Sequence, residues 1–574
     1  EGRRFGRVAA VARGRRKNPA GGTALGGVVD RLKGMGYASS AYRLTLGGRA
    51  PDRLLLQPAD MLPGDASRGS ALLENRYAFA GQEVTVAAGP RPGVSQDGPP
   101  WRHTEAGEFW FRELHSFDWL RDLQALATQA SRARARKLVL HWLDLHTAID
   151  PRPWSPDLLG RRVTAWLAHG EFLLKDSDSS FSKRFFRGLA LQARHLSRTA
   201  RNGEDGAERL LAYKGLLYSG LSLPEGERRT QQALKLLAAE LSRQILPDGG
   251  HFERSPSAHL SVLRHLIDIR GSLIAAGQPA PEALNNAIDR MAPVLRAYRH
   301  GDGALALFND SIENEPWLID LVLAQCAAKG RAQDNAPHTG FRRVQAGRSL
   351  LIADLGAPAR CGRRVHAGTL SFELSAGKER LIVNCGTWRG DDDDWRKALR
   401  ATAAHSTLTV NDTNSCELFD DGSIGAGPSR IESQREDQEG ASWLEAGHDG
   451  YRAPFGLIHR RRLYVAPDGN NLRGEDILTR ADAANRGGRS FAIRFHLHPD
   501  VQASLVQDGG SVLLRPPSGN GWQIRAAGGT IGLNESVYTG DGLTRRRSEQ
   551  VIITGPVEAE ETVIKWALRR IPKN

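Results

Sequence analysis

The sequence predicts an α+β fold in which a helical array or toroid is followed by an antiparallel β-sandwich. Three observations carry this prediction. Apolar residues recur at helical spacing from about residue 107 to 330, they alternate along short segments from about 340 onward, and no strand pattern separates the helices. A chain of 574 residues accommodates two or three domains. We expect a lead-in over residues 1–106, a helical domain over 107–335 and a β-sandwich over 336–574.

The lead-in, residues 1–106, is irregular and basic. It is rich in proline and glycine, and its first 17 residues carry seven basic side chains against Glu1, which is +6 of the net +13. Such an arm can contact nucleic acid or anionic lipid, but a solvated tail is the interpretation we favour. No nucleic-acid-binding motif accompanies the charge, so we expect no specific nucleic-acid partner.

The helical domain begins with "WFRELHSFDWLRDLQALA", where Trp110, Leu114 and Phe117 lie at helical spacing. Similar patterns continue to "EPWLIDLVLAQCAA". Ser255 and Pro256 mark one helix start, because serine caps a helix and proline suits its first turn. Eight or more antiparallel helices are expected.

The β-domain pattern is clearest in "HAGTLSFELSAGKERLIVNCG", residues 366–386. Leu370, Phe372 and Leu374 alternate with polar residues, which predicts a strand headed by His366. Gly377 is placed for a hairpin turn, and a second apolar run follows it. "SFAIRFHLH" and "TVIKWALRR" alternate in the same way, so the sequence predicts an antiparallel sandwich. Its sheet edges offer a possible homodimer interface.

Composition places the chain among globular proteins. No apolar run reaches the roughly 18 residues of a membrane-spanning helix. No signal peptide is visible, which favours the cytoplasm, and a periplasmic location stays open if the N-terminus has been trimmed. The four cysteines form no CxxC pair, which favours reduced thiols over a zinc knuckle.

Several stretches together resemble one family. They are "HAGTLSFEL", "VNCG", "RATAAHSTLTV", "ELHSFDWLRDL", "YKGLLYSGL" and "DGGHFERSPSAH". From about residue 100 to the end, the chain resembles a divergent member of the heparinase II/III-like family. The resemblance implies an incomplete α/α toroid packed against a multilayered β-sandwich. It also implies a cleft in which a uronic-acid-containing polysaccharide, such as a glycosaminoglycan, is cleaved by β-elimination.

Elimination needs a base for the C5 proton, a group that neutralises the neighbouring carboxylate, and an acid for the departing O4. The family usually supplies an asparagine or histidine, a tyrosine and a histidine. This chain has Ala207 and Glu208 at the first positions, Ala258 at the second and Arg364 at the third. The groups left for a lyase are His366 or His405 as base, Arg364 or Arg400 as carboxylate clamp, and His259 or Tyr213 as acid.

The resemblance also implies a metal site. His366, Asn384 and His405 match the family's metal-ligand positions, although an aspartate is usual where Asn384 stands. Two imidazoles suit zinc, and oxygen ligands suit calcium. A hydrogen-bonded network that stabilises strand ends is the alternative to a divalent metal.

Two other functions remain open. Glu208 and Glu253 could act as acid and base of a glycoside hydrolase on the same scaffold. A non-catalytic protein that binds an acidic polysaccharide is the other alternative. In each case His251, Arg254, Trp388 and Arg400 are candidate substrate-binding residues, and Asn309 and Asp310 are either cleft contacts or helix caps. Tyr213 could equally be a packed aromatic, and Glu253 a helix-cap contact.

Overall fold

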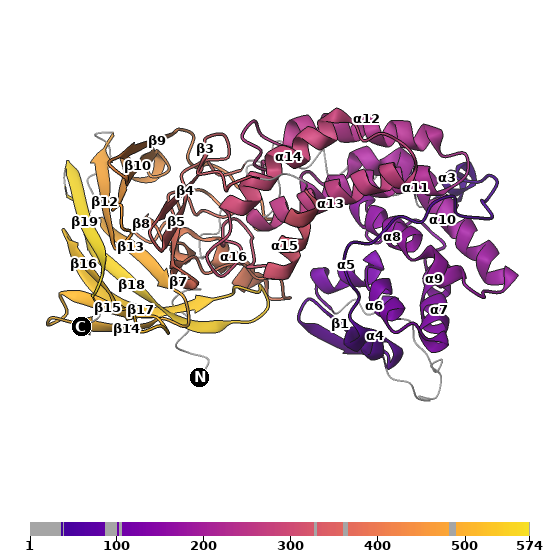
Figure 1. Cartoon of the computed structure of the whole chain (residues 1–574), viewed down its shortest axis with the longest axis horizontal. Coiled ribbons are helices and arrows are strands. Elements are labelled where there is room, and N and C mark those ends of the chain that lie inside the picture. The colour runs from indigo at the N-terminus through magenta and orange to yellow at the C-terminus, as the bar shows by residue number, and fades with distance from the viewer. Residues whose placement is uncertain are drawn as a thin grey trace.

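A helical half and a sheet half lie side by side along the long axis of the molecule (Figure 1). The computed structural model describes residues 36–37, 39–86, 100–102, 106–326, 330–359, 365–481, 489–558 and 560–572. Arg364 therefore lies outside the described residues. The predicted order, helices first and an antiparallel sheet-rich part second, is confirmed.

The described part of the lead-in is more regular than its composition indicates. It contains helices α3 (Ser40–Thr45) and α4 (Ala66–Leu73), the hairpin β1 (Arg76–Phe79) and β2 (Gln82–Thr85), and the turn η2 (Pro100–Arg102). Tyr77, Phe79 and Trp101 are buried in the same core as the helices that follow. The lead-in is thus part of the helical half.

The helical half is a succession of short and medium helices. Within the described residues these are α5 (Glu108–Ser116), α6 (Leu120–Ala125), α7 (Gln129–Leu145), α8 (Pro156–Ala168), α9 (Gly170–Leu174), α10 (Ser179–Thr199), η3 (Ala200–Asn202), α11 (Ala207–Ser222), α12 (Glu227–Gln244), α13 (Pro256–Ala275), α14 (Glu282–Ala297) and α15 (Pro316–Gln325). None of them is long and apolar enough to cross a bilayer. Ser255 caps α13, as predicted, by accepting the N–H of Ala258.

Helices α8 and α11 approach unusually closely, and two glycines permit it. A Cβ on Gly215 would lie 2.5 Å from the carbonyl oxygen of Gly160, and one on Gly160 would lie 2.3 Å from that of Leu211. Both distances are shorter than side chains tolerate. This contact fixes the position of α11, whose first turn lines the candidate site.

The sheet half consists of two antiparallel sheets, as predicted. One runs in the order β14 (Gln502–Val506), β15 (Ser511–Arg515), β16 (Trp522–Ala527), β19 (Glu561–Arg570), β12 (Asn471–Arg480), β11 (Leu457–Val465), β10 (Ala441–His448) and β9 (Ile431–Gln438). The other runs in the order β17 (Thr530–Tyr538), β18 (Arg546–Pro556), β13 (Ser490–Leu497), β7 (Glu379–Val383), β6 (Phe372–Ala376), β5 (Ser349–Asp354), β4 (Phe341–Ala346) and β3 (Asn335–Ala336), with β8 (Leu408–Val410) paired to β13.

The core between the sheets is mainly apolar and aromatic, and it encloses the buried ion pair of Arg461 and Asp476. Phe372 from one sheet stacks on Trp566 from the other, with ring centroids 5.7 Å apart, and Phe495 meets the edge of the same indole. Three short helices, α16 (Asp393–Arg400), η4 (Thr402–Ala404) and α17 (Arg452–Phe455), lie in loops between strands.

The strand predicted from His366 is shorter than expected. The structure begins β6 at Phe372, because Leu370 has a left-handed φ of 64° and the N–H of Ser371 bonds the carbonyl of Gly368 in a turn. His366 therefore lies in a loop before the strand, which corrects the prediction that it heads the strand. The hairpin at Gly377 between β6 and β7 is confirmed.

A buried ion pair and a buried hydrogen bond join the two halves. Arg254, just before α13, pairs with Asp354 of β5 and donates to the carbonyl of Thr339. His300 is hydrogen-bonded to Glu373 of β6 at 2.9 Å, and neither side chain is exposed. We call these contacts the seam. They hold the start of α13 against the sheet half and so set the shape of the cleft.

Candidate functional site in the interdomain cleft

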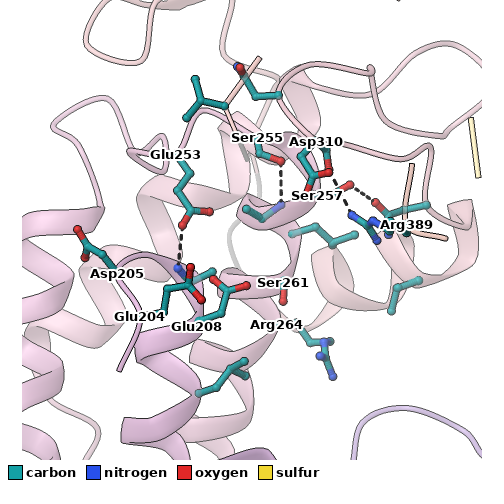
Figure 2. A pocket seen from close by; sticks show the side chains of 18 of the residues that line it. Glu204, Asp205, Glu208, Glu253, Ser255, Ser257, Ser261, Arg264, Asp310 and Arg389 are labelled. Carbon is teal, nitrogen blue, oxygen red and sulfur yellow. Dashed lines mark hydrogen bonds between the residues drawn. The ribbon is translucent and has the colours of Figure 1, made fainter. Parts of the chain in front are cut away.

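A pocket of about 280 Å³ lies where the starts of α11 and α13 meet the loop between α14 and α15 (Figure 2). Val365 and Arg389 close it from the sheet half, and Leu62 from the lead-in. Its other lining residues are Glu204, Asp205, Ala207, Glu208, Leu211, Glu253, Ser255, Ser257, Ala258, Leu260, Ser261, Arg264, Asn309, Asp310, Asn314 and Leu318. We call this the inner pocket.

The inner pocket continues into a larger hollow of about 620 Å³, with which it shares Glu208, Leu211, Ser261, Arg264 and Arg389. The larger hollow holds many cations, but most of them are paired. Lys214 contacts Asp268 at 2.6 Å, and Arg121 contacts Asp60 at 2.9 Å. The two hollows form one cleft along the helical half.

The inner pocket is acidic. Among its described lining residues, five carboxylates stand against the two guanidinium groups of Arg264 and Arg389; the five are Glu204, Asp205, Glu208, Glu253 and Asp310. Burial opposes ionisation of Asp205, but the hydrogen bond and charge of Arg243 still bring its pKa below the usual value. Asp205 is paired with Arg209 and Arg243, and the carboxylates still outnumber the guanidinium groups among the described lining residues, which disfavours an anionic sugar.

Glu253 and Glu208 both line the pocket, as the hydrolase hypothesis requires. Glu253 also reaches the start of α11 and accepts the N–H of Ala207 at 3.1 Å (Figure 2). Gly206 makes room for it: a Cβ there would lie 1.6 Å from the Glu253 Oε1 atom. A carboxylate at a helix N-terminus satisfies an orphan donor and offsets the helix dipole. Glu253 is therefore a cap of α11 as well as a pocket residue.

His366 and His405 lie behind the pocket wall and are joined in one chain of hydrogen bonds. The N–H of Asp310 donates to His366 Nε2 at 3.1 Å, and the Nδ1 atom of His366 lies 3.2 Å from His405 Nε2. The Nδ1 atom of His405 lies 2.8 Å from the carbonyl of Ala401. Because a carbonyl only accepts, each neutral ring donates through Nδ1 and accepts through Nε2.

Burial keeps both rings neutral. It lowers the pKa of His405 to about 4 and that of His366 well below the usual value, where the neighbouring His405 adds to the effect. Asn309 Oδ1 accepts the N–H of His366, so this histidine holds the loop of Asn309 and Asp310 against the pocket. The predicted base candidates thus position the wall and do not line the pocket.

The chemistry of these residues does not fit the implied metal. All four ring nitrogens of His366 and His405 are engaged in the hydrogen-bonded chain, and Asn384 Oδ1 accepts the N–H of Ser406 at 3.0 Å. Within the described residues, no group of three or more His, Cys, Asp or Glu side chains is arranged to hold a metal. Zinc or calcium at this place stays a prediction, and its binding would have to break these bonds.

The remaining candidates from the sheet half are buried away from the inner pocket. Arg400 donates to the carbonyls of Val365, Phe419, Gly422 and Ser423, so its guanidinium is committed to loop packing. Trp388 packs in a small cluster with Cys385, Leu399 and Ala404.

The candidates on the helical half are also internal. His259 contacts the carbonyl of Met291 at 2.9 Å, and His251 contacts Gln244 Oε1 at the same distance. Burial lowers the pKa of His259 to about 4 and that of His251 to about 3. Tyr213 is 5% exposed within the helical core, and burial raises its pKa. Arg254 belongs to the seam. None of the four lines the inner pocket.

Several residues of the pocket wall were not predicted, although the sequence carries signals for them. Glu204 and Asp205 directly precede a helix start, where anionic groups gather. Ser257, Ser261 and Arg264 recur at helical spacing along α13, which places them on one face. The predicted alternatives for Asn309 and Asp310 included a cleft contact, and both line the pocket.

Comparison with known proteins gives the family. Residues 157–327 match the description Heparinase II/III N-terminus, and residues 328–567 match Heparinase II/III-like, C-terminal. The chain belongs to the heparinase II/III-like family. Its fold is that of a crystal structure of heparinase III, which covers 95% of this chain and 92% of the other at 15% identity, with a TM-score of 0.73. The predicted resemblance is confirmed.

Two relatives with curated names differ in what their names describe, a cellular location in one and an enzymatic activity in the other. The chain is 33% identical over 550 residues to the FtsZ-localized protein C of Caulobacter vibrioides (strain NA1000 / CB15N), which covers 93% of each. It is 24% identical over 273 residues to the heparin-sulfate lyase of Pedobacter heparinus, which covers 41% of this chain and 40% of the lyase. The scaffold is that of a polysaccharide lyase, and the fuller match is to a protein named for its location.

Proposed function

We propose that this chain is a non-catalytic glycan-binding protein that works where FtsZ is located. It keeps the cleft of a polysaccharide lyase without the groups that move protons there. One observation carries the proposal: the inner pocket has no histidine or tyrosine among its described lining residues, and Ala258 stands in its wall where the family's tyrosine is common.

β-Elimination requires a group that protonates the departing O4 and a base that removes the C5 proton. A methyl group cannot protonate O4, and the buried histidines behind the wall do not face the pocket. His265 lines the larger hollow, but burial, with the charges of Arg264 and Lys214, lowers its pKa to about 3, so it is a weak base. Apart from His265, no described residue that lines the cleft is a histidine or a tyrosine.

The charge of the pocket indicates the class of glycan. Carboxylates and serine hydroxyls suit the hydroxyl groups of an uncharged or amino-bearing sugar. Uronates would meet five carboxylates there, so the acidic polysaccharide expected from the sequence is not the ligand that we propose for this pocket.

The link to cell division rests on the relative named FtsZ-localized protein C. A fluorescent fusion of the full chain, expressed in its host, is expected to lie in the same band as labelled FtsZ. A uniform distribution in dividing cells would argue against this part of the proposal.

Activity is tested with a panel of neutral, amino-bearing and acidic polysaccharides. Ultraviolet absorbance detects the unsaturated product of a lyase, and new reducing ends detect cleavage by either a lyase or a hydrolase. Calorimetry measures binding. We expect binding without cleavage, with heparinase III as the positive control. Glu208→Gln tests the pocket by weakening that binding, and Glu227→Gln, on the exposed start of α12, is its control. Cleavage by the wild type that Glu208→Gln abolishes would overturn the proposal.

Catalysis by Glu208 is the second candidate function. Glu208 shares the pocket with Arg264 and Arg389, which could neutralise a uronate carboxylate, and with Glu253, which could be a second carboxylate of a hydrolase. Absorbance together with reducing ends would identify the lyase, and reducing ends alone would identify the hydrolase.

A further inference from the structure

The outer face of the eight-stranded sheet carries a second hollow, of about 540 Å³, far along the chain from the cleft residues of α11 and α13. It crosses β10, β11, β12, β19 and β16. Alternation along these strands directs Leu444, Leu472 and Leu568 into the core and leaves the neighbouring residues outside. We call this surface the outer face.

One row of side chains runs straight across the outer face. The strand register pairs Trp443 with Tyr464, Tyr464 with Arg473, Arg473 with Ala567, and Ala567 with Arg525. Neighbouring strands are about 4.8 Å apart, so the row spans roughly 19 Å. It has two aromatic rings at one end and a guanidinium group at the other.

The aromatic end forms a platform. The rings of Trp443 and Tyr464 lie 4.5 Å apart, and Trp443 is 47% exposed. The guanidinium of Arg473 lies 5.4 Å from the Tyr464 ring. An exposed indole beside a tyrosine and an arginine offers a flat apolar surface next to a fixed positive charge.

The rest of the hollow is lined by basic side chains and by small residues of the sheet surface. Among its described lining residues, five exposed cations stand against one carboxylate, Glu475, which contacts Arg462 at 3.1 Å and Lys565 at 3.4 Å. Arg462 also contacts Glu445 at 2.8 Å, outside the lining. The five cations are Arg462, Arg473, Arg525, Lys565 and Arg569. Between them stand the small residues Gly474, Ala526, Ala527 and Ala567. Cations around a floor of small residues leave room for a ligand between them.

We propose that the outer face binds one strand of an anionic polysaccharide. A sugar ring stacks on Trp443 and Tyr464, and the carboxylate or sulfate groups that follow it pair with Arg473, Arg525, Lys565 and Arg569. The excess of positive charge selects a polyanion, and two aromatic rings followed by guanidinium groups along one row suit an extended chain that carries sugar rings and anionic groups. A bilayer is a poorer fit, because its binding needs several projecting apolar side chains, and Trp443 is the one exposed large apolar residue among the described residues that line this hollow.

The test measures binding of a heparin octasaccharide to the full chain by calorimetry and by tryptophan fluorescence, at low and at physiological salt. We expect affinity to fall with salt. Trp443→Ala, and separately the pair Arg473→Glu and Arg525→Glu, are expected to weaken binding about tenfold or more. Thermal unfolding of each variant verifies that it is folded.

The matched control reverses the same amount of charge elsewhere. Arg546 and Arg547 are exposed on β18 of the other sheet, and Arg546→Glu with Arg547→Glu is expected to change affinity by less than about twofold. Equal losses in both charge-reversed pairs would show non-specific attraction and overturn the proposal. So would anionic vesicles or single-stranded DNA that bind through Trp443 when the octasaccharide does not.

The outcome is independent of the function proposed for the cleft. Glu208→Gln should leave octasaccharide binding unchanged, because Glu208 belongs to the inner pocket. A tenfold change of affinity in either direction on Glu208→Gln, with none on Trp443→Ala, would place the polyanion in the cleft and overturn the assignment to the outer face.

Discussion

The inner pocket and the outer face differ in charge, in lining and in how the fold makes them. The pocket gathers five carboxylates at the start of α11, just before α13 and in the loop between α14 and α15, and the packing of α11 against α13 within the helical half brings most of them together. The outer face gathers five cations on adjacent strands, where regular pairing places them. A fold shared with a lyase therefore does not by itself indicate where on the molecule a polyanion would bind.

We expect the largest effect from Arg254→Ala. It leaves the carboxylate of Asp354, 3% exposed, without its partner across the seam. Removing one member of a buried pair costs about 3–5 kcal/mol, and we expect that loss of unfolding free energy in urea. Binding to the outer face should survive in the folded fraction, because the sheets pair without Arg254.

Arg228→Ala, at an exposed position on α12, is the control for Arg254→Ala and should stay within about 0.5 kcal/mol. A loss below about 1 kcal/mol for Arg254→Ala would show that the seam does not depend on this pair.

The next effect concerns the histidines behind the pocket. His405 has a folded-state pKa of about 4, below its ordinary value of 6.5. Its neutral form is favoured by the fold, so its contribution is complete above pH 6.5 and is lost as pH falls towards 4. The shift corresponds to about 3 kcal/mol. Urea unfolding at a series of pH values measures it.

His405→Gln should lower the free energy of unfolding at pH 7. It should also make the unfolding free energy fall less steeply with decreasing pH, because up to one fewer proton is taken up on unfolding. His338→Gln, at an exposed position, should leave the acid loss as in the wild type. An unchanged slope in His405→Gln would contradict the buried hydrogen-bonded chain.

A smaller effect separates capping from ligand binding at Glu253. Glu253→Ala removes the acceptor for the N–H of Ala207 and should cost about 1 kcal/mol of unfolding free energy. Glu253→Gln keeps an oxygen acceptor and should cost less. Equal losses in the two variants would show that the carbonyl-type acceptor is not what matters.

The smallest effect concerns the charge of the inner pocket and its influence on binding of a polyanion. Glu204→Gln together with Glu208→Gln makes the inner pocket less acidic, yet the affinity for a heparin octasaccharide should rise by less than about twofold if that ligand occupies the outer face. Calorimetry against the wild type checks this. A tenfold rise would show that the acidic pocket competes for the same ligand.

By itself the sequence determined the order of the two halves, the antiparallel sheets, the cap at Ser255 and the hairpin at Gly377. Each depends on local periodicity or on the conformational preferences of single residues, which are visible in a short stretch. The family resemblance also predicts that Ala258 and Glu208 stand at positions where the family carries catalytic groups.

Only the tertiary structure decided which polar residues face the cleft. His366 and His405 look like ligands or bases in the sequence, and burial against Asp310 and Ala401 turns them into a neutral hydrogen-bonded chain. Arg400 looks like a carboxylate clamp, and four backbone carbonyls occupy it. Such assignments depend on contacts between segments far apart in the chain, and no local pattern records which donor meets which acceptor.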